Sequence, residues 1–514
     1  MPQNPILSGF YPDPSVCRVG EDFYLVTSSF EFSPGVPVFH SRDLISWRQL
    51  CYVLTRPSQL NLRNAGVSDG IFAPTLRYNS GVFYMITSNR CAKQGNHFFV
   101  TATDPEGPWS EPVWITLPDG TFPGGLDPSL FFDNDGRVYF HCVAWDEAGQ
   151  GVGQAEVDLS SGKLKEPLLV IWHGTGGTFP EGPHIYKRFG YYYVMIAEGG
   201  TEYGHKVTLA RAKHIAGPYE ACPAGPILTQ AVQRAQESEL QGAGHGDLVE
   251  DPTGQWWLIT HAFRPSVGKL HHLGRETVLT AVRWADDGWP VCGSYGCLTA
   301  EIPPLGVAAR AEEQRSEEIA DLFDRKELPL HWNFLRCPEP GQYTVDAGEL
   351  VLTGCALGLN NLGSPTWAGM RQRHFHCVFR AQVLYDPAEG EEGGLTVYQT
   401  PEHHYDIVIR KRASGKVALL RKVVGDIEQT FEEAPLPEGI LTLQVDAARL
   451  AYSFSVTAIG KRAELGSGRT QLLSTEAMLH QNFTGTYFAL FAKTPDGMRS
   501  SGFRIKECRY MPKN

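Results

Sequence analysis

A five-fold repeat is the feature that most limits how this chain can fold. Each unit has a turn-prone segment, a short apolar run, a polar turn and an aromatic-rich strand, as in "LDPSLFFDNDGRVYFHCVAW". The other units are "YPDPSVCRVGEDFYLVTSS", "FAPTLRYNSGVFYMITSN", "PEGPHIYKRFGYYYVMIAEGG" and "GHGDLVEDPTGQWWLITHAF". Two strands joined by a polar turn cannot bury both faces alone, whereas blades packed around an axis can. The repeat therefore predicts a five-bladed β-propeller in residues 1–300.

Equivalent positions of the five units carry chemically active side chains. These positions are Asp13, Ala73, Asp127, Glu181 and His245, with room for four strands between each and the next. The first strand of each propeller blade lines the central channel, so the five side chains should converge at one end of it. A single Asp-Pro is usually a turn, but three acids at one repeat position indicate a catalytic cleft.

The composition of the chain agrees with an all-β enzyme and argues against several other classes. Aromatic residues make up 11% of 514 residues, and 54 Gly and 35 Pro supply many turns. The net charge of −12 disfavours nucleic acid or an anionic membrane as a partner. We find no signal-peptide pattern and no apolar run of membrane-spanning length. The 11 scattered cysteines, without a CxxC pair, suggest reduced thiols in the cytoplasm.

The repeat stops near residue 290, and a second domain is expected after it. Residues 301–322 are rich in Ala and Glu and are predicted to form a linker or a short surface helix. From residue 323 to 514, alternating runs such as "LTVYQT" and "YDIVIRK" return, separated by regular turns. This alternation predicts a β-sandwich.

Four motifs in order, "NPILSGFYPDPS", "GGLDPSLFFD", "EGPHIYK" and "LGRET", resemble those of glycoside hydrolase family 43. The C-terminal part is similar to the concanavalin-like β-sandwich of its β-xylosidase branch. The resemblance implies an all-β fold, a five-bladed β-propeller followed by that sandwich. It also implies hydrolysis of glycosidic bonds with inversion, without a cofactor. Relatives often form dimers or tetramers, so a homo-oligomer is expected.

The resemblance assigns roles to the three acids. Asp13 matches the general base, Glu181 the general acid, and Asp127 the carboxylate that tunes and orients the acid. An inverting site needs one carboxylate to deprotonate water and one carboxylic acid to protonate the leaving oxygen. A second negative carboxylate nearby would keep the acid protonated by raising its pKa.

Two further polar residues are expected at the site. Arg275 matches an arginine that faces the deepest sugar, and its guanidinium could also hold a carboxylate such as Asp127; the alternative is a surface pair with Glu276. His245 matches a histidine near the site floor, where it would contact the sugar, the acid, water or a cation, or serve only structure. The family resemblance leaves calcium in the channel open, although no oxygen-rich loop requires it.

Aromatic rings are expected to wall the pocket, because the C–H faces of sugars pack on rings. Phe30, Phe72 and Trp145 align with such positions, although strand aromatics are more often core residues. Phe483, in "HQNFTGTYF", is expected to reach the site on a loop of the second domain. The alternative for that domain is a free carbohydrate-binding module.

The predicted function is an exo-acting xylan 1,4-β-xylosidase that releases xylose from the non-reducing end of xylo-oligosaccharides. This chain has "FAPTL" where many similar xylosidases have "WAPDL", which leaves room for an α-L-arabinofuranosidase acting on arabinose-bearing oligosaccharides, or for both activities. A catalytically silent, sugar-binding propeller is the alternative from another class. A fructan-processing propeller fits the motif order less well.

Overall fold

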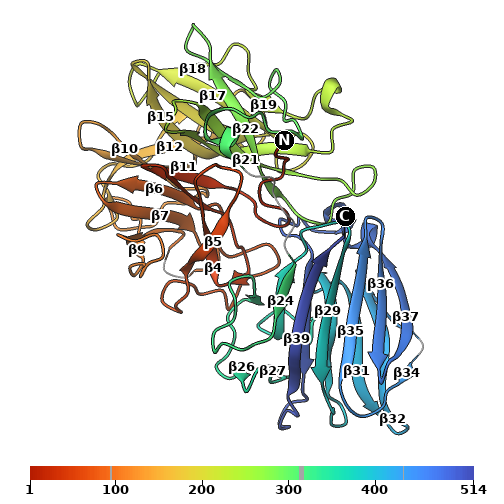
Figure 1. Cartoon of the computed structure of the whole chain (residues 1–514). Helices are drawn as coiled ribbons and strands as arrows, with labels where there is room; N and C mark the ends of the chain where they lie inside the picture. Colours follow the sequence, from red (N-terminus) through yellow and green to blue (C-terminus); the bar gives the residue numbers. More distant parts are fainter. Residues whose placement is uncertain (93–94, 312–317, 432, 514) are drawn as a thin grey trace.

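The computed structural model describes residues 1–92, 95–311, 318–431 and 433–513, and it is almost entirely β-structure. Two bodies lie side by side, a propeller that holds the N-terminus and a sandwich that holds the C-terminus (Figure 1). Short 3-10 turns are the helical elements of the described residues: η1 (Gln233–Ala235), η2 (Gly306–Arg310), η3 (Thr470–Leu473) and η4 (Thr475–Ala477). In the described part of the chain, no helix has the length and apolarity needed to cross a bilayer.

The propeller has five antiparallel sheets, as the repeat predicts, and the first strands of neighbouring sheets contact one another around the centre. Blade 1 contains β1 (Ser15–Val19), β2 (Asp22–Val26), β4 (Gly35–Ser41) and β5 (Arg48–Leu54). Blade 2 contains β6 (Thr75–Asn79), β7 (Val82–Ser88), β8 (His97–Ala102) and β9 (Val113–Trp114). Blade 3 contains β10 (Ser129–Phe132), β11 (Val138–Asp146), β12 (Gly149–Asp158), β13 (Lys163–Leu164) and β14 (Leu169–Trp172).

The remaining two blades follow the same plan. Blade 4 contains β15 (Glu181–Arg188), β16 (Tyr191–Glu198), β17 (Lys206–Ala212), β18 (Glu220–Ala221) and β19 (Leu228–Thr229). Blade 5 contains β20 (Gln241–Glu250), β21 (Trp256–Phe263), β22 (Glu276–Trp284) and β23 (Pro290–Cys292).

Apolar clusters join each blade to the next. Val38 of blade 1 and Met85 of blade 2 share one cluster, and the other three successive boundaries have clusters of their own. The ring closes through a fifth cluster, in which Leu279 of blade 5 packs with Ile6 and Phe23. Each large apolar side chain buried in this way contributes about 1.5–3 kcal/mol. Blade faces are therefore buried by their neighbours, and the inner strands are left to define the channel.

The second domain is a β-sandwich of two antiparallel sheets. One sheet contains β24 (Ile319–Asp321), β26 (Tyr343–Asp346), β27 (Glu349–Leu352), β29 (Cys377–Leu384), β35 (Leu441–Ala448), β36 (Ala451–Ala458), β37 (Lys461–Arg469) and β39 (Phe503–Pro512). The other contains β3 (Phe32–Ser33), β25 (Asn333–Leu335), β28 (Thr366–Arg371), β30 (Glu392–Thr400), β31 (His403–Arg412), β32 (Gly415–Val424), β33 (Ile427–Thr430), β34 (Ala434–Pro435) and β38 (Tyr487–Lys493). Alternate residues of both sheets fill the core between them, as the period of two predicts.

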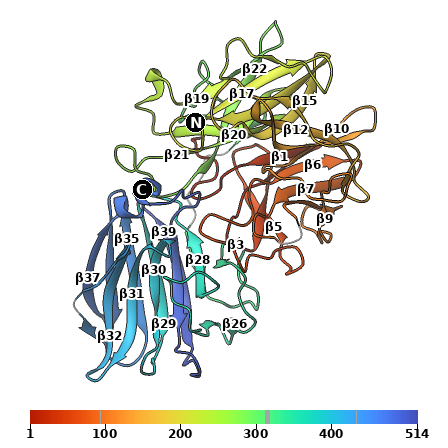
Figure 2. The ribbon, with the colours of Figure 1, turned by 180° about the vertical axis from the view of Figure 1, so that it is seen from behind.

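The two domains are joined by main-chain pairing as well as by packing. β3 lies between two strands of blade 1 in the chain, but it pairs with β25. A short segment of blade 1 thus extends a sheet of the sandwich. Turning the molecule shows β3 and β28 at this junction (Figure 2). An apolar cluster with members from both domains, including Phe10, Phe30, Trp367 and Tyr487, covers the contact.

The predicted linker is shorter than residues 301–322. β24, at Ile319–Asp321, already pairs with β39 in the sandwich, and η2 lies near the start of the segment. β24 has only three residues and lies within a charged stretch, so its alternating pattern is too short to be recognised as a strand in the sequence. The part of the segment at 312–317 lies outside the described residues.

Candidate active site

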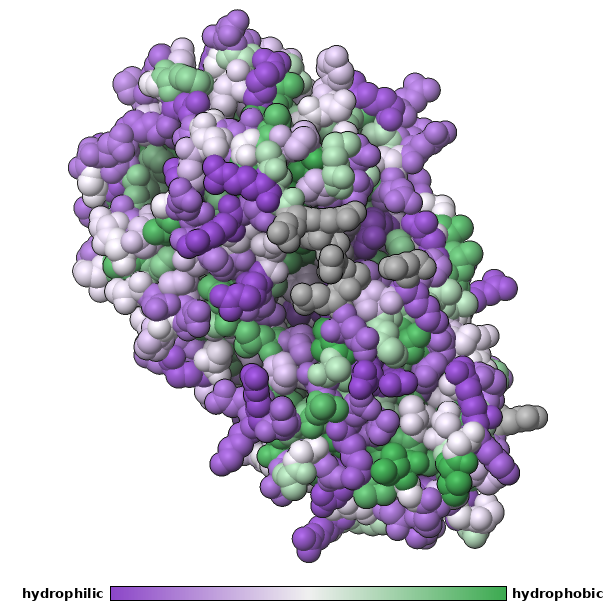
Figure 3. Space-filling view, in the orientation of Figure 1, coloured by the Kyte–Doolittle hydropathy of each residue, from purple (hydrophilic) through white to green (hydrophobic). Residues whose placement is uncertain are grey.

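A cavity of about 190 Å³ lies where the propeller meets the sandwich. Eight of the nine predicted site residues line it: Asp13, Asp127, Glu181, Arg275, His245, Phe30, Phe72 and Phe483. Arg90, Leu126, Phe179, Gly200, Thr201 and Gln481 complete its wall. The face of the molecule in Figure 3 is mostly hydrophilic, with scattered apolar patches.

The repeat position explains why the acids converge. Asp13 and Asp127 each stand two residues before an innermost strand, β1 and β10, and Glu181 is the first residue of β15. His245 lies within β20, at a place where the register against β21 shifts. Asp13, Asp127 and His245 have φ of 53°, 55° and 47°. Non-glycine residues in this left-handed region are uncommon and concentrate at functional sites, where the surrounding structure must hold them.

Four side chains surround the Asp13 carboxylate, and two of them donate hydrogen bonds to it. Arg275 donates from Nη1 to Oδ1 at 2.7 Å, and the Ser28 hydroxyl donates to Oδ2 at 2.6 Å. The Nδ1 atoms of His261 and His245 lie 3.2 and 3.9 Å from Oδ1. Burial alone would raise the pKa of Asp13, but the Arg275 guanidinium holds it well below its ordinary value. Asp13 is therefore ionised at neutral pH.

Glu181 has the opposite electrostatic setting. Burial, followed by repulsion from the Asp13 carboxylate, raises the pKa of Glu181 to about 7. Burial and the charges of Glu181 and Asp13 also raise the pKa of Asp127 well above its ordinary value. Its Oδ2 accepts a hydrogen bond from the Gly182 amide at 3.1 Å. Asp127 and Glu181 therefore compete for ionisation beside an anion, and they cannot both be charged without a large cost.

The structure corrects the expected partner of Arg275. Its guanidinium binds Asp13, not Asp127, and Glu276 pairs instead with Arg264, at 2.6 Å between Oε2 and Nε. The Arg275 side chain is 5% exposed and its carbon Cζ lies 5.5 Å from the centre of the Phe483 ring. A surface ion pair with Glu276 is thereby excluded.

His245 lies between two of the acids. Its Nδ1 is 3.8 Å from Asp127 Oδ2 and 3.9 Å from Asp13 Oδ1. Burial lowers its pKa, so the imidazole is neutral at neutral pH. A Cβ atom at Gly182 would come within 2.9 Å of the His245 ring, which explains why the residue after Glu181 is glycine.

A further buried carboxylate of the channel, Asp247, is paired with protein groups. It accepts hydrogen bonds from Arg77 at 2.6 Å, Tyr186 at 2.6 Å and Ser15 at 2.7 Å. Arg77 thus supplies the positive charge that balances Asp247 inside the propeller. Among the described residues, no group of three or more acids, histidines or cysteines is arranged to hold a metal ion.

Three phenylalanines in contact with one another form one apolar wall of the cavity. Phe30 stacks on Phe483 with ring centres 5.6 Å apart, and Phe72 meets Phe30 edge-on at 5.0 Å. Phe483 comes from the segment before β38, and its amide donates to Ser68 Oγ of the propeller at 2.8 Å. The wall is the edge of the apolar cluster that joins the domains, so domain packing fixes its position.

Trp145 is the predicted residue that lies outside the cavity. It is 59% exposed and lines a neighbouring depression of about 370 Å³. Arg90 and Leu126 border both hollows. Arg90 itself is placed over the Phe72 ring, with 5.2 Å from Cζ to the ring centre. The resemblance placed Trp145 in the wall of the pocket, whereas the structure places it, near the end of β11, in the neighbouring depression.

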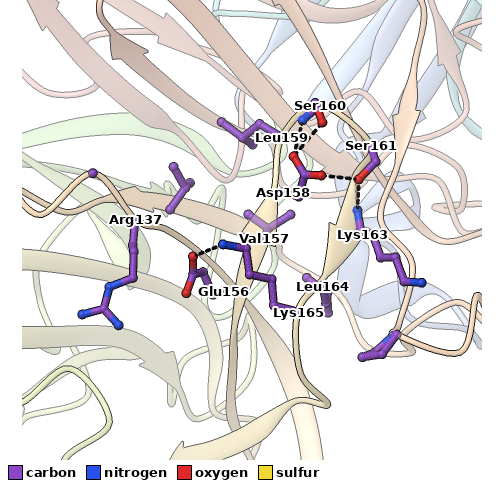
Figure 4. A pocket seen from close by; sticks show the side chains of 13 residues that line it. Arg137, Glu156, Val157, Asp158, Leu159, Ser160, Ser161, Lys163, Leu164 and Lys165 are labelled. Carbon is purple, nitrogen blue, oxygen red and sulfur yellow. Dashed lines mark hydrogen bonds and ion pairs between the residues drawn. The ribbon is translucent and has the colours of Figure 1, made fainter.

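A larger open groove of about 790 Å³ lies on blade 3, between β11, β12 and β13. Figure 4 shows Lys165 paired with Glu156, and Asp158 bound by Ser160 and Ser161. The groove shares no lining residue with the cavity that contains the acids.

Several residues of the site were not identified from the sequence. Ser28 and His261 contact Asp13 from the ends of strands, and Arg90, Phe179 and Gln481 line the cavity from loops. The repeat could have suggested His261, because "LITHAF" ends the fifth unit as "LVTSS" ends the first. For the loop residues, no periodic signal exists.

Comparisons with known proteins agree on one family. A model of glycosyl hydrolases family 43 matches residues 2–290, and a model of the beta xylosidase C-terminal concanavalin A-like domain matches residues 320–503. A non-reducing end alpha-L-arabinofuranosidase of Bacteroides ovatus is 39% identical, over 95% of this chain and 91% of its own length. A xylosidase/arabinosidase of Butyrivibrio fibrisolvens is 40% identical, over 87% of each chain. The crystal structure of a xylan beta-1,4-xylosidase from Bacillus halodurans has a TM-score of 0.92 at 35% identity, over 99% of this chain and 100% of that one.

Proposed function

Because the chain belongs to glycosyl hydrolases family 43, we propose that it is an exo-acting, inverting β-xylosidase that releases xylose from the non-reducing end of β-1,4-xylo-oligosaccharides. The observation that carries the proposal is the opposite ionisation of two carboxyl groups in one cavity. The pKa of Asp13 is held well below its ordinary value, whereas that of Glu181 is raised to about 7. A general base and a general acid of hydrolysis require this difference.

The reaction proposed for this pair is a single displacement. Asp13 takes a proton from water as the water oxygen attacks the anomeric carbon. The bond from that carbon to the leaving oxygen breaks, and Glu181 gives its proton to this oxygen. Asp127 accepts a hydrogen bond from the Gly182 amide and so fixes the main chain next to Glu181. In this proposal Asp127 orients Glu181. Because the pKa of Asp127 is itself raised, Asp127 is less often ionised than the sequence suggested, and it repels a charge on Glu181 less.

The shape of the cavity supports exo action. At about 190 Å³ it is smaller than the roughly 300–1,000 Å³ typical of sites for drug-sized ligands. Phe483 and Gln481 of the sandwich close one side of it. A terminal sugar would fit, whereas an internal unit of a polymer would need an opening at both ends. The depression beside Trp145 and Arg90 would receive the leaving part of the substrate.

An α-L-arabinofuranosidase is the second candidate, alone or combined with xylosidase activity. Phe72 takes the place of a tryptophan common among similar xylosidases, and the Bacteroides ovatus relative is named for arabinofuranosidase activity. The same acid and base would serve both sugars. The preference would then depend on the phenylalanine wall. For either sugar, the 11 cysteines without a disulfide support a cytoplasmic enzyme.

The test is a paired rate assay with aryl β-D-xylopyranoside and aryl α-L-arabinofuranoside. We expect faster cleavage of the xyloside and a loss of about 10²–10⁴-fold in the Asp13→Ala variant, the usual range for acid–base catalysis. The matched control is Asp135→Ala, because Asp135 is an exposed carboxylate on blade 3 paired with Arg137. Faster cleavage of the arabinoside would support the second candidate. No cleavage of either by folded protein would leave a sugar-binding propeller.

A further inference from the structure

Two buried histidines lie behind Asp13 and take no part in the hydrolysis proposed above. His261, on β21, has no exposed surface, and His205, just before β17, is 3% exposed. Their rings are 5.0 Å apart between centres. Burying an imidazole without hydrogen-bond partners destabilises a protein. The hydrogen bonds of these two rings therefore indicate their role.

The contacts form a chain that ends at the main chain of Asp13. The Asp13 amide donates to His261 Nδ1 at 3.1 Å, and His261 Nε2 lies 3.2 Å from His205 Nδ1. A backbone N–H can only donate, so Nδ1 of His261 must be the acceptor and its proton must be on Nε2. His205 Nδ1 faces that side of the ring and also lies 3.3 Å from the Gly242 carbonyl oxygen. The Asp13 amide therefore selects the tautomer of His261, and His205 packs against the His261 ring and fixes its position.

The sequence around these rings is built to make room for them. Gly244, in the "GAGHG" segment of β20, lies against His205: a Cβ atom there would be 2.4 Å from the ring. Any other residue at 244 would displace His205 and remove the partner of His261 Nε2. The glycine-rich segment does not have the context of a phosphate-binding loop. At Gly244, the close His205 ring explains why the residue is glycine.

The amide of Asp13 needs such an acceptor because of its conformation. Asp13 has a φ of 53°, in the left-handed region, between Pro12 and Pro14. This amide is buried, and a buried N–H without a partner is strongly disfavoured. Ser28 and Arg275 bind the carboxylate, and their main chains pair with Pro12 O and Tyr11 N, but neither accepts the Asp13 amide. His261 is the acceptor of that amide.

We propose that His261, oriented by His205, is a positioning residue that holds Asp13 in the geometry required of the general base. The proposal rests on the role of Asp13 in the proposed function. The imidazole must be neutral, since a protonated Nδ1 could not accept the amide. Burial and the Arg275 charge lower the pKa of His261 to about 3, which keeps it neutral throughout the working range.

The experiment compares His261→Leu, which removes the acceptor, with His261→Asn, whose Oδ1 can take the place of Nδ1. His205→Phe keeps a ring behind His261 but removes the polar contact with His261 Nε2. His404→Leu is the control for the loss of a buried imidazole, because His404 pairs with Asp406 in the sandwich, away from the cavity. For each variant we would measure kcat and KM on an activated aryl glycoside, the pH profile of kcat/KM, and the thermal unfolding midpoint.

We expect kcat of His261→Leu to fall about 100-fold with little change in KM, as for a displaced catalytic group. The acidic limb of its profile should move to higher pH, because Asp13 would no longer be held against Arg275. His245, Glu181 and Asp127 also face Asp13, and they are unchanged in the variants. His261→Asn should recover much of kcat, and His205→Phe should show a smaller loss of the same kind.

A folded His261→Leu protein with unchanged kcat and acidic limb would overturn the proposal. So would equal losses in His261→Asn and His261→Leu, since both would then reflect only the missing ring. If His261→Leu does not fold, His261→Asn and His205→Phe are compared with wild type instead. Unchanged kcat and an unchanged acidic limb in His205→Phe would then overturn the proposal. If wild type itself cleaves neither aryl glycoside, the proposed function fails instead, and the two failures are distinguishable.

Discussion

At the scale of single residues, the proposed chemistry depends on three carboxyl groups that are buried together but ionise differently. Asp13 has a cation, a hydroxyl and an imidazole within reach, whereas Glu181 has no guanidinium or ammonium bound to it among the described contacts. Identical chemical groups thus become a base and an acid through their surroundings. The sequence could identify the three acids from their repeat position, but not this asymmetry, because a repeat position does not show which carboxylate Ser28, His261 or Arg275 contacts.

Replacing Glu181 by glutamine tests the acid at this scale. Glu181→Gln should lower the rate by about 10²–10⁴-fold on xylobiose, whose leaving oxygen must be protonated, and far less on an activated aryl xyloside. Because Glu181 acts in its protonated form, wild-type activity should fall as pH rises through about 7, and this limb should disappear in the variant. The measurement is a pH–rate profile for both substrates. Asp135→Ala again serves as the control. Equal losses on the two substrates would argue against Glu181 as the acid.

At the scale of elements, strands were more predictable than the segments between them. The period of two and the turn glycines predicted the blades, since strand β15 follows Pro180 and the turn at Gly190 leads to β16. β24 and β3 were not predicted, because strands of two or three residues are set by their partners β39 and β25. Trp145 shows the same limit of the sequence pattern. The pattern places Trp145 on a strand, but its position near the end of β11 decides whether its side chain reaches the cavity.

The segment before β38 provides a test at the scale of elements. Phe483→Ala should raise KM for aryl xylosides and lower kcat/KM by about ten-fold, because an aromatic contact of about 0.5–1.5 kcal/mol and the closed wall are lost. Leu479→Ala is the matched control, since Leu479 lies on the same segment and is 85% exposed. Steady-state kinetics on both variants would check this. Unchanged kinetics in Phe483→Ala would show that the sandwich does not shape the site.

At the scale of the whole molecule, the sandwich is part of the catalytic unit. The Phe30 and Phe483 rings are in contact across the domain boundary, and β3 pairs with β25. The sequence indicated two domains and a reaching loop. It could not show that main-chain hydrogen bonds join them, because such pairing leaves no side-chain pattern. This arrangement disfavours a freely moving carbohydrate-binding module.

The central claim is a single displacement by Asp13 and Glu181, and the stereochemistry of the product tests it most directly. Proton NMR of the first minutes of hydrolysis of an aryl β-D-xyloside would show which anomer of xylose forms before mutarotation. Inversion predicts that α-xylose appears first, with the β-anomer growing in later. Initial release of β-xylose would mean a covalent intermediate and would contradict the assignment of Asp13 as a base acting on water.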